Sequence, residues 1–244
     1  AAHIETPEGR APWGPDFPTI HFTDRIHRFH WLRDLGSLGP AGESRARALM
    51  VAWADAYGKW ENFAWRLSIT ADRLINWLCA GPWLFAPLEG EARLSVLETI
   101  GRQLRHLQFS GPEETDPVSR FRIAVALCLG GAATEDGRKI LETGLAMLEA
   151  ECAAQILPDG GHVSRSPEAL AEAMLDIQTV EELLLRLGVN APGFLTKLQP
   201  RMAAMLSFLQ QADGGLLPAN GGGDSSNGIA QAAMRPQIGR ASCR

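Results

Sequence analysis

The sequence contains a single tyrosine, Tyr57, against seven tryptophans, and it has no apolar run of about 18 residues that could form a transmembrane helix. Neither sign of charge dominates, since 23 basic and 28 acidic residues give a formal net charge of -5. This mild acidity gives no electrostatic reason to expect nucleic acid or an anionic membrane surface as a partner. No secretory signal peptide is visible. An apolar content of 45% over 244 residues is enough to bury the core of one or two globular domains.

Metal-ligating residues are also sparse. The four cysteines form no CxxC pair, and three of them lie in apolar helical patterns, so they are interpreted as small buried hydrophobes. His27 and His30 are three residues apart on a predicted helix, with His21 nearby. No third ligand follows at a convincing spacing for zinc. We therefore expect neither a metal site nor a cofactor.

Helical periodicity runs through most of the chain after an irregular segment of Pro- and Gly-rich sequence at residues 1–23. No segment alternates apolar and polar residues over a useful length, so the sequence predicts an all-α protein whose neighbouring helices are antiparallel and joined by short loops. The predicted helices are residues 24–36, 42–57, 69–80, 89–109, 117–129, 134–156, 167–187 and 192–210, the last with a break or kink at Pro200.

A short motif occurs twice. The sequence Asp-Gly-Gly at residues 159–161 recurs at residues 213–215, 54 residues later, each time directly after a long amphipathic helix. Such a repeat suggests stacked helical hairpins whose loops collect at one end. We therefore expect the segments ILPDGGHVSRSP (156–167) and QADGGLLPANGGGDSSNG (211–228) to lie near each other. Their glycines permit positive φ and a close approach of ligand to backbone.

The first of these segments holds more chemistry than a helix connection needs. Ser166 and Pro167 are explained as the cap and first residue of the next helix. His162 and Arg165 have no such explanation. They are either a loop histidine at a helix end and a solvated arginine, or functional residues.

Three stretches resemble the heparinase II/III-like family of polysaccharide lyases. Residues 156–167 resemble the family's helix-connecting motif, roughly DGGH-x-E-x-SP, and FHWLRDLGSLG (29–39) resembles its bacterial members. The helix WRLSITADRLINWL (65–78) resembles a tryptophan–arginine helix of the family. The matching positions there are Trp65, Ala71, Arg73, Asn76 and Trp77.

The resemblance implies an incomplete α/α toroid, here residues 24–236, followed in the family by a large antiparallel β-sandwich. We expect that this chain holds only the toroid and that the sandwich is a missing partner domain of the same protein. The last residues, 237–244, read QIGRASCR. Because their reverse translation looks like a sequencing adapter, we expect this tail to be non-native. The family suggests a periplasmic or cell-envelope location, with the cytoplasm as the alternative.

The family's chemistry is β-elimination on a polysaccharide that contains uronic acid. A base removes the proton on C5 while donors neutralise the neighbouring carboxylate. By resemblance, His162 would neutralise the carboxylate or act as the base, and Arg165 would bind a carboxylate or sulfate of the acidic polysaccharide. The residues predicted to bind substrate are Trp65, Arg73, Asn76, Trp77, Asn220 and Asp224. For Arg73 and Asn76 the alternative is a buried polar network between hairpins.

The sequence also departs from the family. Ser164 stands at the acidic position of the motif, and the family's tyrosine acid/base, expected one repeat after the histidine, is replaced by Leu216 and Leu217. Three hypotheses follow: a polysaccharide lyase toroid, a non-catalytic carbohydrate-binding or scaffold protein of the same fold, and a hydrolase of unsaturated uronides. The hydrolase would need paired carboxylates, for which Asp159 and Asp213 are available. Their shared turn motif favours turn formation instead.

Overall fold

The computed structural model describes residue 13 and residues 19–220 and 232–234. In this part of the chain the regular structure is helical, without a named strand. The helices are α1 (Ile20–His27), α2 (Leu32–Ser37), α3 (Pro40–Tyr57), α4 (Leu67–Ala80), α5 (Pro82–Phe85), α6 (Gly90–Ser110), η1 (Gly111–Glu113), α7 (Pro117–Ala133), α8 (Arg138–Gln155), α9 (Pro167–Arg186) and α10 (Gly193–Phe208).

The chain divides into two compact units, residues 1–145 and 146–244, and each is described by itself. The predicted domain of residues 24–236 therefore stays a prediction. None of the helices in the described residues is both long and apolar enough to span a membrane.

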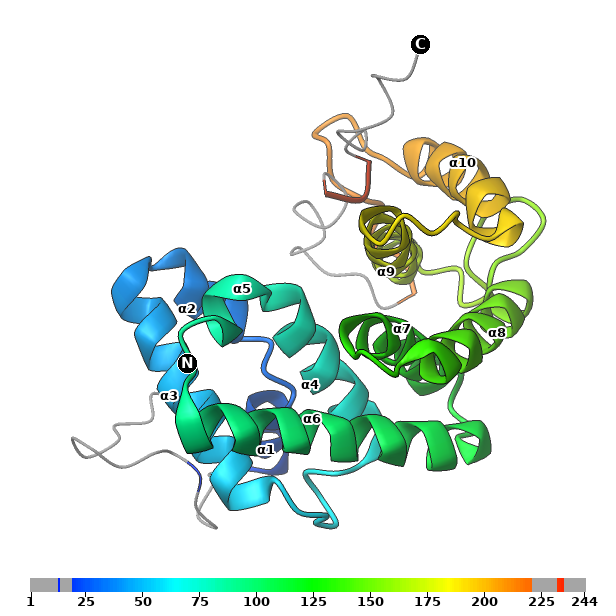
Figure 1. The fold of residues 1–244 in the computed structure, drawn as a ribbon. Helices are drawn as coiled ribbons and strands as arrows, with labels where there is room; N and C mark the ends of the chain where they lie inside the picture. Colours follow the sequence, from blue (N-terminus) through cyan, green and yellow to red (C-terminus); the bar gives the residue numbers. More distant parts are fainter. Residues whose placement is uncertain (1–12, 14–18, 221–231, 235–244) are drawn as a thin grey trace. The chain divides into compact units, whose positions relative to one another are not determined.

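Helix α4 lies at the centre of the first unit. It packs on α7 more extensively than on any other element and also contacts α6, as Figure 1 shows. Both α4 and α7 bury residues on almost every side, and the buried residues of α4 include the charged Asp72 and Arg73. The outer helices α3 and α6 pack on each other. This arrangement surrounds the predicted tryptophan–arginine helix with protein.

The single helix predicted at residues 24–36 is wrong, because the chain breaks between α1 and α2. Phe29 adopts a φ of 61°, which ends α1, and its ring is fully buried. The ring meets Trp53 and Trp77 edge-on, with centroids 6.1 and 5.2 Å away. An unfavourable φ at a bulky residue persists only when the surroundings determine it. Here the aromatic packing around Phe29 sets the break, and no local sequence signal predicts it.

Helices α9 and α10 form a hairpin in the second unit. The Ser166 hydroxyl accepts a hydrogen bond from the amide of Ala169, and Pro167 is the first residue of α9, as predicted. Across the hairpin, the Gln199 amide donates to Glu181 at 2.7 Å inside the core. Pro200 does not end α10, which continues from Gly193 to Phe208.

Candidate functional site

The two Asp-Gly-Gly segments form the same loop twice. We call residues 155–167 the first DGG loop and residues 209–220 the second DGG loop. An antiparallel bridge joins Ile156 to His162 in the first loop and Gln210 to Leu216 in the second. Three backbone hydrogen bonds also recur with a shift of 54 residues. Named from amide donor to carbonyl acceptor, those of the first loop are Leu157 to Gly161, Gly160 to Leu157 and Val163 to Gln155. Those of the second loop are Gln211 to Gly215, Gly214 to Gln211 and Leu217 to Leu209. The sequence repeat is therefore a structural repeat.

Each aspartate of the repeat closes its own turn. The Asp159 carboxylate accepts from the Gly161 amide at 2.8 Å, and the Asp213 carboxylate accepts from the Gly215 amide at 2.9 Å. Gly160, between the first pair, has a φ of 86°, which glycine adopts without strain. These contacts favour the turn-forming interpretation of both aspartates over a catalytic pair.

The two loops contact each other, as predicted. The Asn220 side-chain amide donates to the Arg165 carbonyl at 3.1 Å. Both residues have positive φ, 49° and 57°, which is uncommon for residues other than glycine. Asp224 lies outside the described residues.

His162 is buried within the first DGG loop, with 8% of its surface exposed. The Ser164 amide donates to its Nδ1 at 3.2 Å, so Nδ1 is an acceptor and the proton of the neutral ring is on Nε2. Nε2 then lies 3.3 Å from Oε1 of Gln155 and donates to it. Burial lowers the pKa of His162, which favours the same neutral form.

Two residues that the sequence analysis missed extend this network into α8. The Gln155 amide donates to the Glu151 carboxylate at 2.9 Å, and both side chains are buried. On the other side, the Ser164 hydroxyl lies 2.7 Å from Nδ1 of His162 and accepts from the Ser166 amide. The available signal was a Glu–Gln pair four residues apart at the end of a helix that leads into the loop.

Arg165, in contrast, lies at the surface. Its guanidinium forms an ion pair with Asp159 at 3.0 Å, and both side chains are substantially exposed. The Gly161 amide, and then Arg165, lowers the pKa of Asp159. The first DGG loop therefore presents a guanidinium outside and a neutral imidazole inside.

Arg73, predicted to bind substrate, is fully buried in the first unit. Its guanidinium donates to the Ala64 and His27 carbonyls at 2.9 and 3.1 Å and to the Gln103 side chain at 2.8 Å. It also lies over the Trp53 ring, 4.0 Å from the centroid. This geometry favours the buried-network alternative, and a role in substrate binding stays a prediction.

The two predicted tryptophans are also part of the interior. Trp77 is fully buried, and Trp65 is 4% exposed and donates from its indole to the Tyr57 carbonyl at 2.8 Å. Asn76 is half-buried and donates to the Arg28 carbonyl at 2.8 Å. A stacking or hydrogen-bonding role for these three residues toward a sugar stays a prediction.

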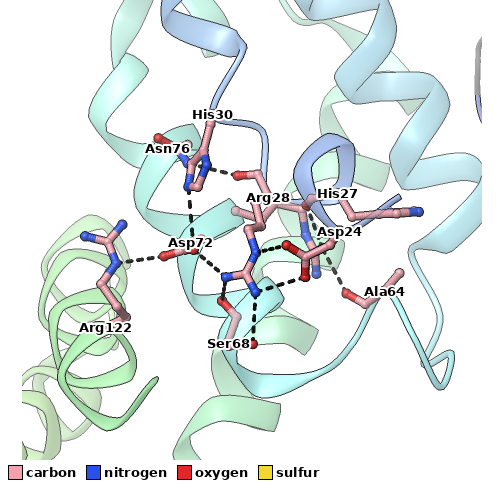
Figure 2. A network of polar contacts seen from close by, with 10 residues as sticks. Asp24, His27, Arg28, His30, Ala64, Ser68, Asp72, Asn76 and Arg122 are labelled. Carbon is pink, nitrogen blue, oxygen red and sulfur yellow. Dashed lines mark hydrogen bonds and ion pairs between the residues drawn. The ribbon is translucent and has the colours of Figure 1, made fainter. Parts of the chain in front are cut away.

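An ion cluster that the sequence analysis missed surrounds Asp72 on α4. Figure 2 shows Asp72 between Arg28, whose Nη1 is 2.6 Å away, and Arg122 of α7, whose Nε is 2.7 Å away. His30 approaches the same carboxylate to 3.5 Å. Burial alone would raise the pKa of Asp72, but His30, Arg122 and Arg28 together lower it. The cluster ties the chain after α1 to α4 and α7.

His21, His27 and His30 do not form a metal site. Within the part of the chain that the structure describes, no group of three or more His, Cys, Asp or Glu side chains is placed to hold a metal ion. Nδ1 of His27 instead accepts a hydrogen bond from the Trp53 indole at 2.9 Å.

No family model matches this chain. A curated relative, FtsZ-localized protein C of Caulobacter vibrioides (strain NA1000 / CB15N), is 32% identical over 215 residues, which cover 86% of this chain and 36% of the relative. Among solved structures, heparinase III matches with a TM-score of 0.65 at 16% identity, over 83% of this chain and 33% of that one. Heparan sulfate lyase HepC from Pedobacter heparinus matches with a TM-score of 0.60 at 18% identity, over 82% and 34%.

The two structural matches confirm the predicted fold class, an all-α, incomplete α/α toroid of antiparallel helical hairpins. At 16% and 18% identity these matches show the fold alone. The chain spans about a third of the length of each of these three proteins. The activity, substrates and partners of the full-length protein are therefore treated as proposals.

Proposed function

We propose that this chain is the helical part of a heparinase-like protein that binds an acidic polysaccharide, and that its own toroid residues do not transfer the proton. One observation carries the proposal: both ring nitrogens of His162 are engaged inside the first DGG loop. A general base needs an acceptor nitrogen within reach of the substrate proton. In His162 the acceptor nitrogen faces the Ser164 amide instead.

The second DGG loop supports the same conclusion. Leu216 takes the place there that His162 takes in the first loop, and it is followed by Leu217. Neither leucine can donate or accept a proton. The residue type that the resemblance requires at this loop is therefore absent from these positions.

Arg165 is the residue that fits an anionic sugar. Its present partner, Asp159, is also exposed, and solvent screens an exposed ion pair so that it contributes little to stability. A carboxylate or sulfate of a polysaccharide can therefore replace Asp159 at little cost. The planar guanidinium can bind either group through two parallel hydrogen bonds.

The curated relative adds support for a binding role. It is named for localization to FtsZ and not for a reaction. A polysaccharide-binding or scaffold function is consistent with that name, and it would require no acid/base in the toroid.

A second candidate is the polysaccharide lyase itself, with β-elimination on a uronic acid. Nε2 of His162 carries a proton, and its hydrogen bond to Gln155 is long at 3.3 Å. If Nε2 turned to a substrate carboxylate, it would stabilise the charge that develops there. The acid and base would then come from the rest of the longer protein, including the family's β-sandwich.

One experiment separates the candidates. The chain and the full-length protein are each mixed with heparan sulfate, alginate and polygalacturonate, and binding, ultraviolet absorbance and reducing ends are measured. Binding without absorbance supports the main proposal. Growth of the absorbance of a conjugated 4,5-double bond supports the lyase, and new reducing ends without it support a hydrolase. No binding and no reaction with any polymer would reject the proposal.

A further inference from the structure

The two DGG loops share a backbone but differ in what fills them. His162 is 8% exposed and Leu216 is 4% exposed, so the two positions are equally enclosed. The same contrast extends into the preceding helices. At the three equivalent positions the first copy has Glu151, Gln155 and His162, and the second copy has Met205, Leu209 and Leu216.

The second copy shows that the turn does not need polar side chains at these three positions. Its bridge, its backbone hydrogen bonds and its glycine with a φ of 85° form around leucine. Burying polar groups costs free energy unless every hydrogen bond is made, and apolar side chains of similar size often stabilise as well or better. The polar chain from Glu151 to His162 is therefore an addition to the loop and not a condition for folding it.

Each link of this chain fixes the orientation of the next. The Glu151 carboxylate has no proton to donate, so it must face the side-chain NH2 group of Gln155. The other end of the Gln155 amide, Oε1, is then turned toward His162. Oε1 requires a donor, so it selects the tautomer with the proton on Nε2. Nδ1 then accepts a hydrogen bond from the Ser164 amide. Two residues later, Ser166 caps α9.

Arg165 lies between Ser164, which bonds His162, and Ser166, which caps α9. Its own amide donates to the His162 carbonyl at 2.8 Å, and its φ is 57°. A residue in this sparsely populated conformation is held by its neighbours. In the second loop the equivalent position is Ala219, and no charged group is presented there.

We propose that Glu151 and Gln155 are positioning residues of the first DGG loop, which hold the His162 imidazole with its proton on Nε2 and so fix the backbone that presents Arg165 to an anionic ligand. The ligand in this statement rests on the proposed function. The positioning itself does not, because it concerns the state of His162 in the free protein.

The test uses Gln155→Leu, which gives the first loop the residue of the second. The ring-nitrogen shifts of His162 are measured by NMR on histidine-labelled chain, together with the melting temperature and the affinity for heparan sulfate. The unaltered chain should show one tautomer, protonated on Nε2. The variant should show a mixture of tautomers and roughly tenfold weaker binding, because the loop no longer holds Arg165 toward the ligand. Its melting temperature should fall, because Glu151 and His162 lose the hydrogen bonds of Gln155, but unfolding should stay cooperative.

Two further variants are controls. The exchange Glu151→Gln with Gln155→Glu keeps an acceptor opposite Nε2, so it should restore the single tautomer. Leu209→Ala alters the equivalent position of the second loop without touching the polar chain, so it should leave the His162 tautomer unchanged.

Two results would overturn the inference. If Gln155→Leu keeps both the tautomer and the affinity, Gln155 does not position His162. If Gln155→Leu abolishes cooperative unfolding, the polar chain is required by the fold. If the tautomer shifts as expected but the unaltered chain binds no polysaccharide, the positioning stands and the proposed function fails.

Discussion

His162 and Leu216 occupy equivalent places in two copies of one loop, 54 residues apart, and each forms an antiparallel bridge with a residue that follows the preceding helix, Ile156 after α8 and Gln210 after α10. The backbone around them is the same, so the difference between them is one of chemistry alone. A neutral imidazole with a buried acceptor stands in one copy and an aliphatic side chain in the other. This pair gives the chain its own internal control for experiments on either loop.

Replacing Arg165 should weaken polysaccharide binding without affecting stability. For Arg165→Ala we expect roughly tenfold weaker binding, because one charge-assisted contact contributes about 1.4 kcal/mol. Arg186→Ala is the matched control, since Arg186 is also an exposed arginine of the same unit and is also in an ion pair, with Glu182. Equal losses in the two variants, measured by titration calorimetry at one salt concentration, would contradict a specific role.

The two repeat glycines should respond differently to alanine. Gly160 and Gly214 have nearly the same φ, so each Gly→Ala change costs about 1–2 kcal/mol for the left-handed backbone. At Gly160 the new Cβ would also meet the Arg201 carbonyl at 2.3 Å, whereas at Gly214 the nearest atom is 3.9 Å away. Gly160→Ala should therefore cost about 1–3 kcal/mol more. Equal free energies of unfolding in urea would show that this loop tolerates the displacement.

Truncating Arg73 should destabilise the first unit strongly. Arg73→Ala leaves several buried acceptors without a donor, which should cost at least about 3 kcal/mol. Arg73→Lys should rescue little, because an ammonium cannot reproduce the planar set of donors. The measurement is unfolding followed by tryptophan fluorescence, with Trp53 beside the guanidinium as the reporter. A folded, stable Arg73→Lys variant that had lost polysaccharide binding would instead support the predicted substrate role.

The ion cluster around Asp72 should be worth far more than the exposed pair at Asp159. Asp72→Asn leaves Arg28 and Arg122 without their shared carboxylate, which should cost about 3 kcal/mol or more. Asp159→Asn should leave the free energy of unfolding almost unchanged, because solvent screens the exposed ion pair. The two variants are compared by urea unfolding at neutral pH. Similar losses would mean that the buried cluster is less tightly formed than its distances indicate.

Stability should fall in mild acid because of His27. Burial, and then the charge of Arg73, lowers the pKa of His27 to about 4. The unfolded chain has the ordinary pKa of about 6.5, so it binds the proton first as the pH falls. The stabilisation is therefore complete above pH 6.5 and is lost between about 6.5 and 4, up to about 3 kcal/mol. Urea unfolding at several pH values measures the slope, and in His27→Gln most of this slope should disappear.

Much of the fold follows from local rules. Apolar residues spaced three and four apart, a capping serine before Pro167, and a glycine directly after α3, α4 and α6 are enough to place α3, α4, α6, α7, α8, α9 and α10. The repeat of Asp-Gly-Gly also predicts two neighbouring loops, because a turn that closes on its own aspartate depends on few residues beyond it. The spacing of residues along the chain is therefore enough to predict these helices and the two turns.

The tertiary structure decided what spacing cannot show. The break at Phe29 depends on tryptophans from two other helices, and the burial of Arg73 depends on acceptors that come from three separate segments. The state of His162 depends on Gln155 and Ser164, which its position in the sequence does not identify as partners. Desolvation and hydrogen bonding act between atoms that folding brings together. The sequence by itself determined the helices and the loop that holds His162 and Arg165, and only the packing decided which of the two faces solvent.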